Sequence, residues 1–315
     1  MRRLSLPLVL ALTSCAAGSS DGGSSSATDS GSSDVTPRDG STETAADTGA
    51  VVDDGGFSID APTFDAISGD GCAEDTKRVY VVSKAKELHR FDPAALTFTK
   101  VGALTCPAGT ATPFSMAIDR AGVAWILYND GHIFHASTKD ASCTATKYVA
   151  DQLSWHTFGM AFAADAPGSS SETLYVAEID KALGKIDTKT LTLSAVGEYG
   201  KTSVPAELTG RADGKLFAFF QRTAFSTAGS RISELDPKTG KILAEKNPPS
   251  VDVGSGWAFA HWGGTYWLFT APGGTNSIVQ EYDYDAGTTK TVVADVGFKI
   301  VGAGVSTCAP TARPK

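Results

Sequence analysis

One short stretch, "ELDPKTGKI" at 234–242, brings together residue types that suit a metal or phosphate site. Asp236 offers a carboxylate, Lys238 an ammonium group and Thr239 a hydroxyl. Similar stretches recur as "RFDPAALTF" (90–98), "KIDTKTLTL" (185–193) and "EYDYDAGTTK" (281–290). The first question is whether this is a repeated site or a repeated piece of scaffold.

The aspartates of these stretches fit the chemistry of tight turns. An aspartate that opens a turn accepts a hydrogen bond from a backbone N–H two residues on, proline presets φ for the next position, and glycine tolerates positive φ. A catalytic aspartate is needed once, not four times. We therefore predict turns at Asp92, Asp187, Asp236 and Asp283, with Ser137 taking the same place in a unit that lacks the aspartate.

A second group of polar and aromatic residues is more suited to binding a ligand. It consists of Trp155, His156, Gln221, Arg222 and Trp257. An aromatic ring beside amide and guanidinium donors suits a sugar, a peptide or a flat ring. The alternative is that both tryptophans pack in the core while the histidine and the arginine are solvated.

Glu207 is the strongest candidate for catalysis, because an acid inside a narrow channel is desolvated and its pKa rises. Together with His156 it could serve a lyase or a glycoside hydrolase. Glycoside hydrolysis, however, needs two carboxylates that flank one bond, and Glu207 stands alone at a suitable depth. The alternative is a hydrogen-bonded wall residue.

The other chemistry-bearing residues show no motif of a known reaction. His132 and His135 are three apart on a predicted strand and so face opposite sides, and the remaining histidines are not paired in sequence. No nucleophilic serine motif, P-loop or dinucleotide fingerprint is present in the sequence. We therefore predict no metal and no cofactor.

The elements that position these residues are short strands. Runs such as "VAWILYND", "KLFAFFQR" and "TYWLFTA" are rich in β-branched and aromatic residues and are bounded by Gly, Asp, Pro or Asn, which indicates strands. They group into four units, at 114–149, 158–197, 206–246 and 257–295, each with four predicted strands. A period of about 45 residues with four strands per unit is typical of a β-propeller.

A fifth unit is split between the two ends of the domain. Residues 79–104 supply three strands, and "IVGAGVSTC" (300–308) supplies the missing first strand. The pattern resembles β-propellers, including those of NHL and quinoprotein-like repeats. We predict an all-β, five-bladed propeller closed by both chain ends, an irregular β-sandwich being the alternative. The resemblance implies a ligand over the central channel, where the loops that carry Trp155, Gln221 and Trp257 would lie.

Four cysteines follow residue 71, and an even number in an exported chain predicts two disulfides. Three pairings are possible, and free thiols are the alternative. We favour Cys72–Cys308, which would join the ends of the propeller, and Cys106–Cys143, which would join neighbouring units.

The N-terminus has the layout of a secretory signal peptide, with two arginines, an apolar run and small residues. Its end, "LTSC", resembles a bacterial lipobox, which implies lipidation of Cys15 and attachment to a membrane through acyl chains. We predict a signal peptide at 1–14, a lipidated and disordered Ser/Gly/Asp-rich linker at 15–71 and a propeller domain at 72–315. Ala16 after the cysteine favours the outer membrane over the inner.

The net charge of −8 comes from the linker, where eleven acids accompany one base, whereas residues 72–315 hold 24 bases and 24 acids. A neutral domain does not suit nucleic acid as a partner. We expect a monomeric cell-envelope lipoprotein whose propeller binds a protein, peptide or glycan, and which is more plausibly not an enzyme; the alternative is the lyase or glycoside hydrolase described above.

Overall fold

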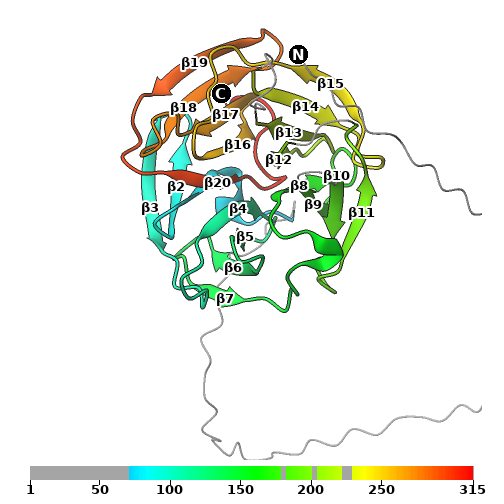
Figure 1. Ribbon diagram of the computed structural model, residues 1–315. Helices are drawn as coiled ribbons and strands as arrows, with labels where there is room; N and C mark the ends of the chain where they lie inside the picture. The colour runs from blue at the N-terminus through cyan, green and yellow to red at the C-terminus, as the bar shows by residue number, and fades with distance from the viewer. Residues whose placement is uncertain (1–70, 179–181, 201–203, 222–228, 315) are drawn as a thin grey trace, which may run out of the picture. The chain divides into compact units, whose positions relative to one another are not determined.

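The computed structural model describes residues 71–314 apart from 179–181, 201–203 and 222–228. The described residues form five antiparallel four-stranded sheets arranged around a central axis, as in a β-propeller (Figure 1). The predicted all-β, five-bladed architecture is confirmed. The predicted signal peptide, Cys15 and all but the last residue of the predicted linker lie outside the described residues.

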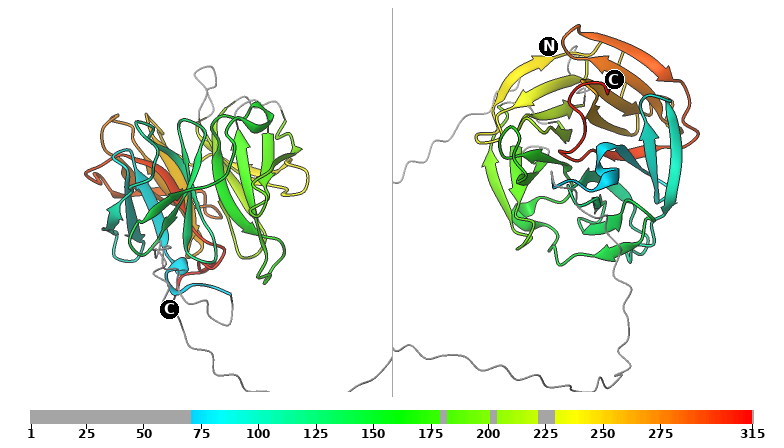
Figure 2. Two further views of the ribbon diagram at one scale, coloured as in Figure 1. Left: turned by 90° about the horizontal axis from the view of Figure 1, so that it is seen from below. Right: turned by 180° about the vertical axis from the view of Figure 1, so that it is seen from behind.

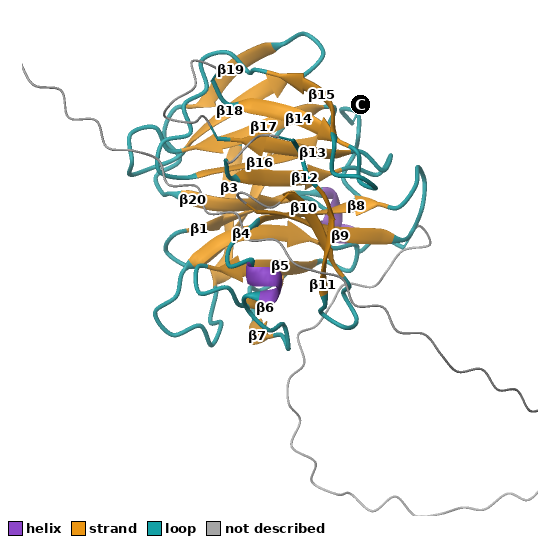
Figure 3. Cartoon of the chain, turned by 45° about the vertical axis from the view of Figure 1, so that its right-hand side comes forward, coloured by secondary structure: helices purple, strands orange, loops and turns teal. Residues whose placement is uncertain are grey.

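The blades, lettered A to E, follow one another around the axis. From the innermost to the outermost strand they are blade A, β20 (Ile300–Gly304), β1 (Val79–Ser83), β2 (Glu87–Asp92) and β3 (Thr97–Ala103); blade B, β4 (Pro113–Ile118), β5 (Val123–Tyr128), β6 (Ile133–Ser137) and β7 (Cys143–Ala145); blade C, β8 (Gly159–Ala164), β9 (Glu172–Glu178), β10 (Ala182–Ile186) and β11 (Leu193–Gly197); blade D, β12 (Ala206–Gly210), β13 (Leu216–Phe220), β14 (Arg231–Leu235) and β15 (Ile242–Lys246); and blade E, β16 (Trp257–Trp262), β17 (Thr265–Thr270), β18 (Ile278–Asp283) and β19 (Thr288–Val293). In the part of the chain that the structure describes, helix is limited to the short 3-10 elements η1 (Glu74–Lys77) and η2 (Gln152–Ser154) (Figure 3).

The hydrophobic core lies between the faces of neighbouring blades. The second strands β1, β5 and β13 are buried at every residue, whereas the outermost strands are mostly exposed. At the interface of blades B and C, for example, Trp125 packs edge-on against Phe162 with ring centroids 5.9 Å apart. Burial on both faces explains why the second strands read as continuous apolar runs in the sequence.

Both chain ends build blade A, as predicted. Strand β20 pairs antiparallel with β1, with Tyr80 opposite Gly304 and Val81 opposite Ala303. The predicted disulfide Cys72–Cys308, here called the closing disulfide, is present with its Cα atoms 5.9 Å apart. A ring closed in this way leaves no free inner edge at the point where the first and last blades meet.

The second predicted disulfide, Cys106–Cys143, is also present, with its Cα atoms 4.8 Å apart. It joins the segment after β3 of blade A to β7 of blade B and is here called the interblade disulfide. Two disulfides are typical of proteins exposed to an oxidising compartment, so both pairings agree with an exported protein.

The repeated aspartates are turn residues, as predicted. Asp236 Oδ1 accepts a hydrogen bond from the Lys238 N–H at 2.9 Å, and Asp187 Oδ1 does the same for Lys189 at 2.9 Å. In blade B, Ser137 Oγ accepts a bond from the Lys139 N–H at 3.2 Å. The stretch "ELDPKTGKI" is therefore the turn between the third and fourth strands of a blade.

The inner strands β8 and β12 approach each other too closely for side chains at two positions. A Cβ atom added at Gly159 would lie 2.1 Å from the Ala206 carbonyl oxygen, and one at Gly210 would lie 2.0 Å from the Phe162 carbonyl oxygen. Glycine at these two positions lets the backbones of blades C and D meet beside the channel.

The inner strands all begin on one face of the propeller and end on the other. We call the face where the inner strands begin the mouth face, and the face where they end the terminal face. Cys72 and Cys308 lie on the terminal face, since Cys308 follows the end of β20 and the Ala73 N–H donates to the carbonyl of Arg120, just after β4. Figure 2 (left) shows η1 and the C-terminal segment together at that end.

Candidate functional site

Two cavities lie where the inner strands begin, on the mouth face. The larger, about 200 Å³, is here called the mouth cavity, and the smaller, about 60 Å³, the small cavity. Both are lined by Phe114 of β4, Glu207 of β12 and Trp257 of β16. These residues come from blades B, D and E, so the cavities belong to the central channel rather than to one blade.

The aromatic wall arises from the repeat. Phe114 and Trp257 are among the first residues of their inner strands, and Phe158, which lines the small cavity, directly precedes β8. One slot of the repeat therefore supplies an aromatic ring to the channel mouth in three blades. The ligand-binding prediction named only Trp257 of these three, although the parallel starts "FSMAID", "FGMAFA" and "WAFAHW" contain the signal.

Glu207 forms the polar floor of both cavities. It is 3% exposed, and its Oε2 atom accepts a hydrogen bond from the Ser115 hydroxyl at 2.7 Å. The Ser115 Oγ atom in turn accepts the Met160 N–H at 3.2 Å. This chain links inner strands β4, β8 and β12 beside the channel.

The charge state of Glu207 follows from these surroundings. Burial raises the pKa of its carboxyl well above the usual range, and the hydrogen bond from Ser115 opposes this only in part. No charged group of the described residues offsets the loss of water. Burial therefore favours the protonated, neutral form of the carboxyl. Glu207 is thus buried in the channel, and its bond from Ser115 also fits the alternative of a hydrogen-bonded wall residue.

The rim of the mouth cavity carries several N–H donors. Trp257 Nε1 is buried and has no hydrogen-bond partner among the described residues. Asn129 Oδ1 accepts the Thr112 N–H at 2.9 Å, which orients the Nδ2 amide hydrogens away from that bond. Lys84 Nζ donates to Thr112 Oγ1 at 3.0 Å.

His156 lies on the mouth face but does not line either channel cavity. Its Nδ1 atom lies 2.7 Å from Asp151 Oδ1, and its Nε2 donates to the Asn129 carbonyl at 3.2 Å. The Asp151 carboxylate raises the pKa of His156, since the protonated ring donates to both oxygens. Asn129 lines the mouth cavity, and His156 contacts the backbone of Asn129 without lining the cavity itself.

Trp155 is a packing residue, in contrast to its predicted place at the mouth. It is 3% exposed and belongs to the cluster between blades B and C. A Cβ atom added at Gly184 would lie 2.8 Å from two carbons of its indole ring. The ring fills the space that this glycine leaves, so Trp155 is not available to a ligand.

The other two residues of the binding prediction are Gln221, which lines neither cavity, and Arg222. Gln221 is half-buried, and its backbone N–H donates to the Pro205 carbonyl at 3.1 Å. Pro205 lines the small cavity, so Gln221 borders the site without lining it. Arg222 lies outside the described residues.

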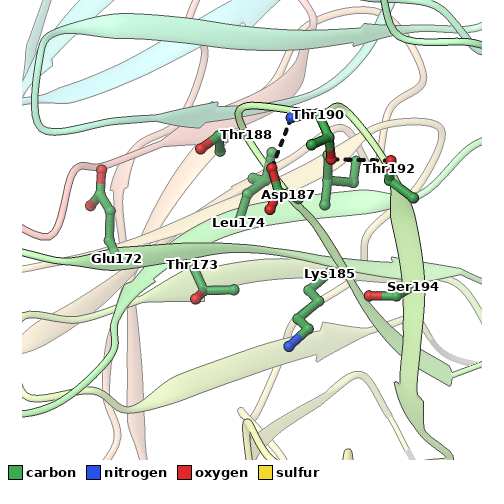
Figure 4. Close-up of a pocket in the computed structure, with 10 residues that line it drawn as sticks. Glu172, Thr173, Leu174, Lys185, Asp187, Thr188, Thr190, Thr192 and Ser194 are labelled. Atoms are coloured by element: carbon green, nitrogen blue, oxygen red, sulfur yellow. Dashed lines mark hydrogen bonds between the residues drawn. The ribbon is translucent and has the colours of Figure 1, made fainter. Parts of the chain in front are cut away.

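Another cavity lies on the outer part of blade C, away from the channel. It measures about 490 Å³, and its lining comes from β9, β10, β11 and the turn between β10 and β11. Figure 4 shows Asp187 held there by the N–H of Thr190, at 2.8 Å. This aspartate is one of the four turn residues, and the cavity gathers no aromatic wall.

Two half-buried acids, Asp119 and Glu172, lie on the terminal face. Glu172 Oε1 accepts the Arg120 N–H at 2.9 Å, and its Oε2 accepts the Thr307 hydroxyl at 2.7 Å. Burial raises the pKa of Glu172 to about 7, and burial likewise raises that of Asp119. These contacts tie blade C to the segment that carries the closing disulfide, which is a structural role.

Within the described ranges, no group of three or more His, Cys, Asp or Glu side chains is arranged to hold a metal ion. The same part of the chain contains no helix long and apolar enough to cross a membrane.

Comparisons with known proteins supply no family. A scan of protein-family models gave no match, and a search of curated proteins found no similar sequence. Among solved structures, the extracellular domain of the putative one component system BT4673 from B. thetaiotaomicron is similar over 72% of this chain, with 16% identity and a TM-score of 0.39. The structure of U3-55K is similar over 74% of this chain and 83% of its own, with 11% identity and a TM-score of 0.42. This chain spans 29% of the length of the first of the two. The fold assignment rests on the sheet topology described above.

Proposed function

We propose that this chain is an exported lipoprotein of the bacterial cell envelope that displays its propeller as a binding module. The ligand is a protein, peptide or glycan of the envelope, and it binds at the mouth cavity. The protein acts as a monomer without cofactor or nucleic acid, and Cys15 anchors it in the outer membrane.

One observation carries this proposal: an aromatic-walled cavity at the channel mouth contains polar groups that the described residues leave unpaired. Phe114, Trp257 and Glu207 line this space, and the buried Trp257 indole N–H has no hydrogen-bond partner among the described residues. Apolar walls with a few convergent polar groups are what small-ligand and side-chain pockets share. Unpaired buried donors cost free energy, and a ligand that accepts from them recovers it.

The anchor is supported by the sequence and by the position of the chain ends. The motif "LTSC" after an apolar run supports lipidation of Cys15, and the two disulfides support export. Cys72 follows the linker and lies on the terminal face, so the tether joins the propeller on the face opposite the mouth cavity. The kinship with NHL or quinoprotein-like repeats remains a prediction.

The geometry favours binding over catalysis. Glu207 is the single carboxyl among the described residues that line the two channel cavities, whereas glycoside hydrolysis needs two carboxyls about 5–10 Å apart. The alternative pair of Glu207 and His156 is not assembled, because His156 lines neither cavity and its ring bonds to Asp151 and Asn129.

The test compares capture of envelope components by the full acylated chain and by two variants. The wild-type protein, Trp257→Ala and Leu243→Ala are immobilised in detergent and exposed to solubilised envelope extract from the source bacterium. Leu243 is the control because it is 61% exposed on outer strand β15, away from the channel.

We expect Trp257→Ala to weaken capture about 30-fold, since buried tryptophans at the centre of interfaces typically contribute 2 kcal/mol or more. Leu243→Ala should bind like the wild type, and circular dichroism should show that both variants are folded. Equal capture by all three proteins would exclude the mouth cavity as the site, and a wild type that retains nothing would contradict a binding function.

A further inference from the structure

The polar lining of the mouth cavity consists almost entirely of hydrogen-bond donors. Apart from Glu207, its polar side chains are Lys84, Asn129, Ser255 and Trp257. An ammonium group and an indole N–H can only donate. The cavity therefore favours a ligand group that accepts hydrogen bonds.

Glu207 acts as a donor because its acceptor atom is already used. The Ser115 hydroxyl donates its one proton to Glu207 Oε2, and the Ser115 Oγ atom separately accepts the Met160 N–H. The carboxyl proton is then on Oε1, and none of the described residues accepts it. Since Glu207 is 3% exposed and lines both channel cavities, this O–H is a buried donor directed at them.

Asn129 and Ser255 are fixed in compatible roles. The Asn129 oxygen accepts the Thr112 N–H, which leaves the two Nδ2 hydrogens for another partner. Ser255 Oγ accepts from Lys299 Nζ at 2.8 Å and donates to the Gly274 carbonyl at 3.2 Å, so both of its functions are occupied. Neither side chain offers a free strong acceptor to a ligand.

Three lysines give the same rim a positive charge. The Nζ atoms of Lys84, Lys86 and Lys299 bond to neutral oxygens of Thr112, Gly109 and Ser255, respectively, at 3.0, 2.8 and 2.8 Å. Lys84 and Lys299 are adjacent, since the Lys84 N–H donates to the Lys299 carbonyl at 2.9 Å. Among the described residues, none of the three ammonium groups is paired with a carboxylate.

We propose that the mouth cavity recognises a carboxylate group of a peptide or protein, which accepts from Glu207, Trp257 and Asn129 beside the lysine rim. This proposal rests on the proposed function and narrows its ligand. A carboxylate has only acceptors and a negative charge, and it matches a site that has donors and a positive rim. Phe114 and Trp257 hold the aliphatic carbons next to the carboxylate.

The same chemistry argues against the other ligands. The hydroxyls of a glycan must donate as well as accept, and the described side chains that line the cavity offer them few free acceptors. A cationic side chain would meet the lysines and a carboxyl that is neutral. A peptide carboxylate has two sources, the side chain of Asp or Glu and the free C-terminus, and both are tested below.

The experiment measures the binding of dansyl-labelled hexapeptide pools to the full acylated chain in detergent, by fluorescence anisotropy at pH 7. Apart from one fixed central position, the pools contain random uncharged residues. The first has a central Glu and an amidated end, the second a central Gln and an amidated end, and the third a central Gln and a free C-terminal carboxylate.

We expect the first or the third pool to bind at least tenfold more tightly than the second, and the tighter of the two identifies the source of the carboxylate. No preference for either carboxylate pool, including no binding at all, would overturn the proposal. Preferential retention of a neutral or uronic-acid oligosaccharide over all three pools would overturn it as well.

Variants test the role of each donor. Glu207→Gln keeps an acceptor for Ser115 and an N–H donor for the cavity, so binding should stay within about threefold of the wild type. Glu207→Leu removes the donor and should weaken binding at least tenfold. If Glu207→Gln stays folded but loses binding, Glu207 acts as an anion and the proposal is wrong.

The lysine rim has a matched control. Lys84→Met should weaken binding of the carboxylate pool about tenfold and reduce its dependence on salt, whereas Lys238→Met, in an exposed turn of blade D, should change neither. Equal effects of the two variants would contradict the role of the rim. If Trp257→Ala abolishes capture from envelope extract but the carboxylate pools show no preference, the binding function stands and this inference alone fails.

Discussion

The proton on Glu207 predicts how the stability of the propeller depends on pH. A buried carboxyl whose pKa is raised in the folded protein stabilises the fold fully only below its pKa in the unfolded chain, about 4.3. Above that pH the unfolded chain releases the proton while the folded protein retains it. The free energy of unfolding of the wild type therefore falls as the pH rises, until the folded carboxyl also ionises.

The substitution Glu207→Gln isolates this effect. Glutamine has nearly the same shape as the protonated carboxyl, can accept from the Ser115 hydroxyl as Glu207 does at 2.7 Å, and does not titrate. At pH 4 the two proteins should have similar stability, within about 1 kcal/mol. For each pH unit over which the folded wild type still holds its proton, the variant should gain about 1.4 kcal/mol relative to the wild type.

The assay is urea unfolding of both proteins at pH 4, 5, 6 and 7 and constant ionic strength, followed by tryptophan fluorescence. Other groups with shifted pKa values, such as Glu172, titrate in both proteins and cancel in the difference. Parallel curves, with no gap that grows with pH, would show that Glu207 is ionised in the folded protein. A gap that grows toward acid would show that its pKa is lowered, and either result would refute the neutral carboxyl.

Two further predictions concern the closure of the ring and the packing of its inner strands. Replacing both cysteines of the closing disulfide by serine should lower the free energy of unfolding by about 5.5 kcal/mol, and the same change at the interblade disulfide by about 4 kcal/mol. The first loss is larger because the closing disulfide closes a loop of 236 residues and the interblade disulfide one of 37. If calorimetry shows a larger loss for the interblade disulfide, this order is wrong. Gly159→Ala should cost about 3 kcal/mol, since its Cβ would lie 2.1 Å from the backbone of Ala206, whereas Gly273→Ala, with open space around it, should cost less than 1 kcal/mol in the same urea assay.

The blade pattern could be predicted from the sequence because it depends on local chemistry. Strand alternation and the hydrogen bonds of Asp92, Asp187 and Asp236 to backbone atoms two or three residues on are encoded within a few positions. Counting these turns placed the blades in order. The incomplete first unit then pointed to Cys72 and Cys308 as neighbours.

The site could be predicted only in part, because its geometry depends on residues far apart in the chain. A tryptophan in a loop can pack or bind, and Trp155 packs because Gly184, 29 positions later, leaves room for its ring. Ser115 and Asn129 carried no sequence signal, since their roles arise from contacts with Glu207 and with the loop before β4.

Glu207 links the stability of the ring to the chemistry of the proposed site. Its Oε2 atom bonds to Ser115 of blade B from blade D, so the bond passes the intervening blade C and holds three inner strands together. The bond needs one carboxyl oxygen as an acceptor, and burial then keeps a proton on the other. A donor directed at the cavity is thus a consequence of how the ring is closed around a narrow channel. Ligands that accept from this donor stabilise the same protonated form that the ring requires, so ligand binding and ring stability should strengthen each other.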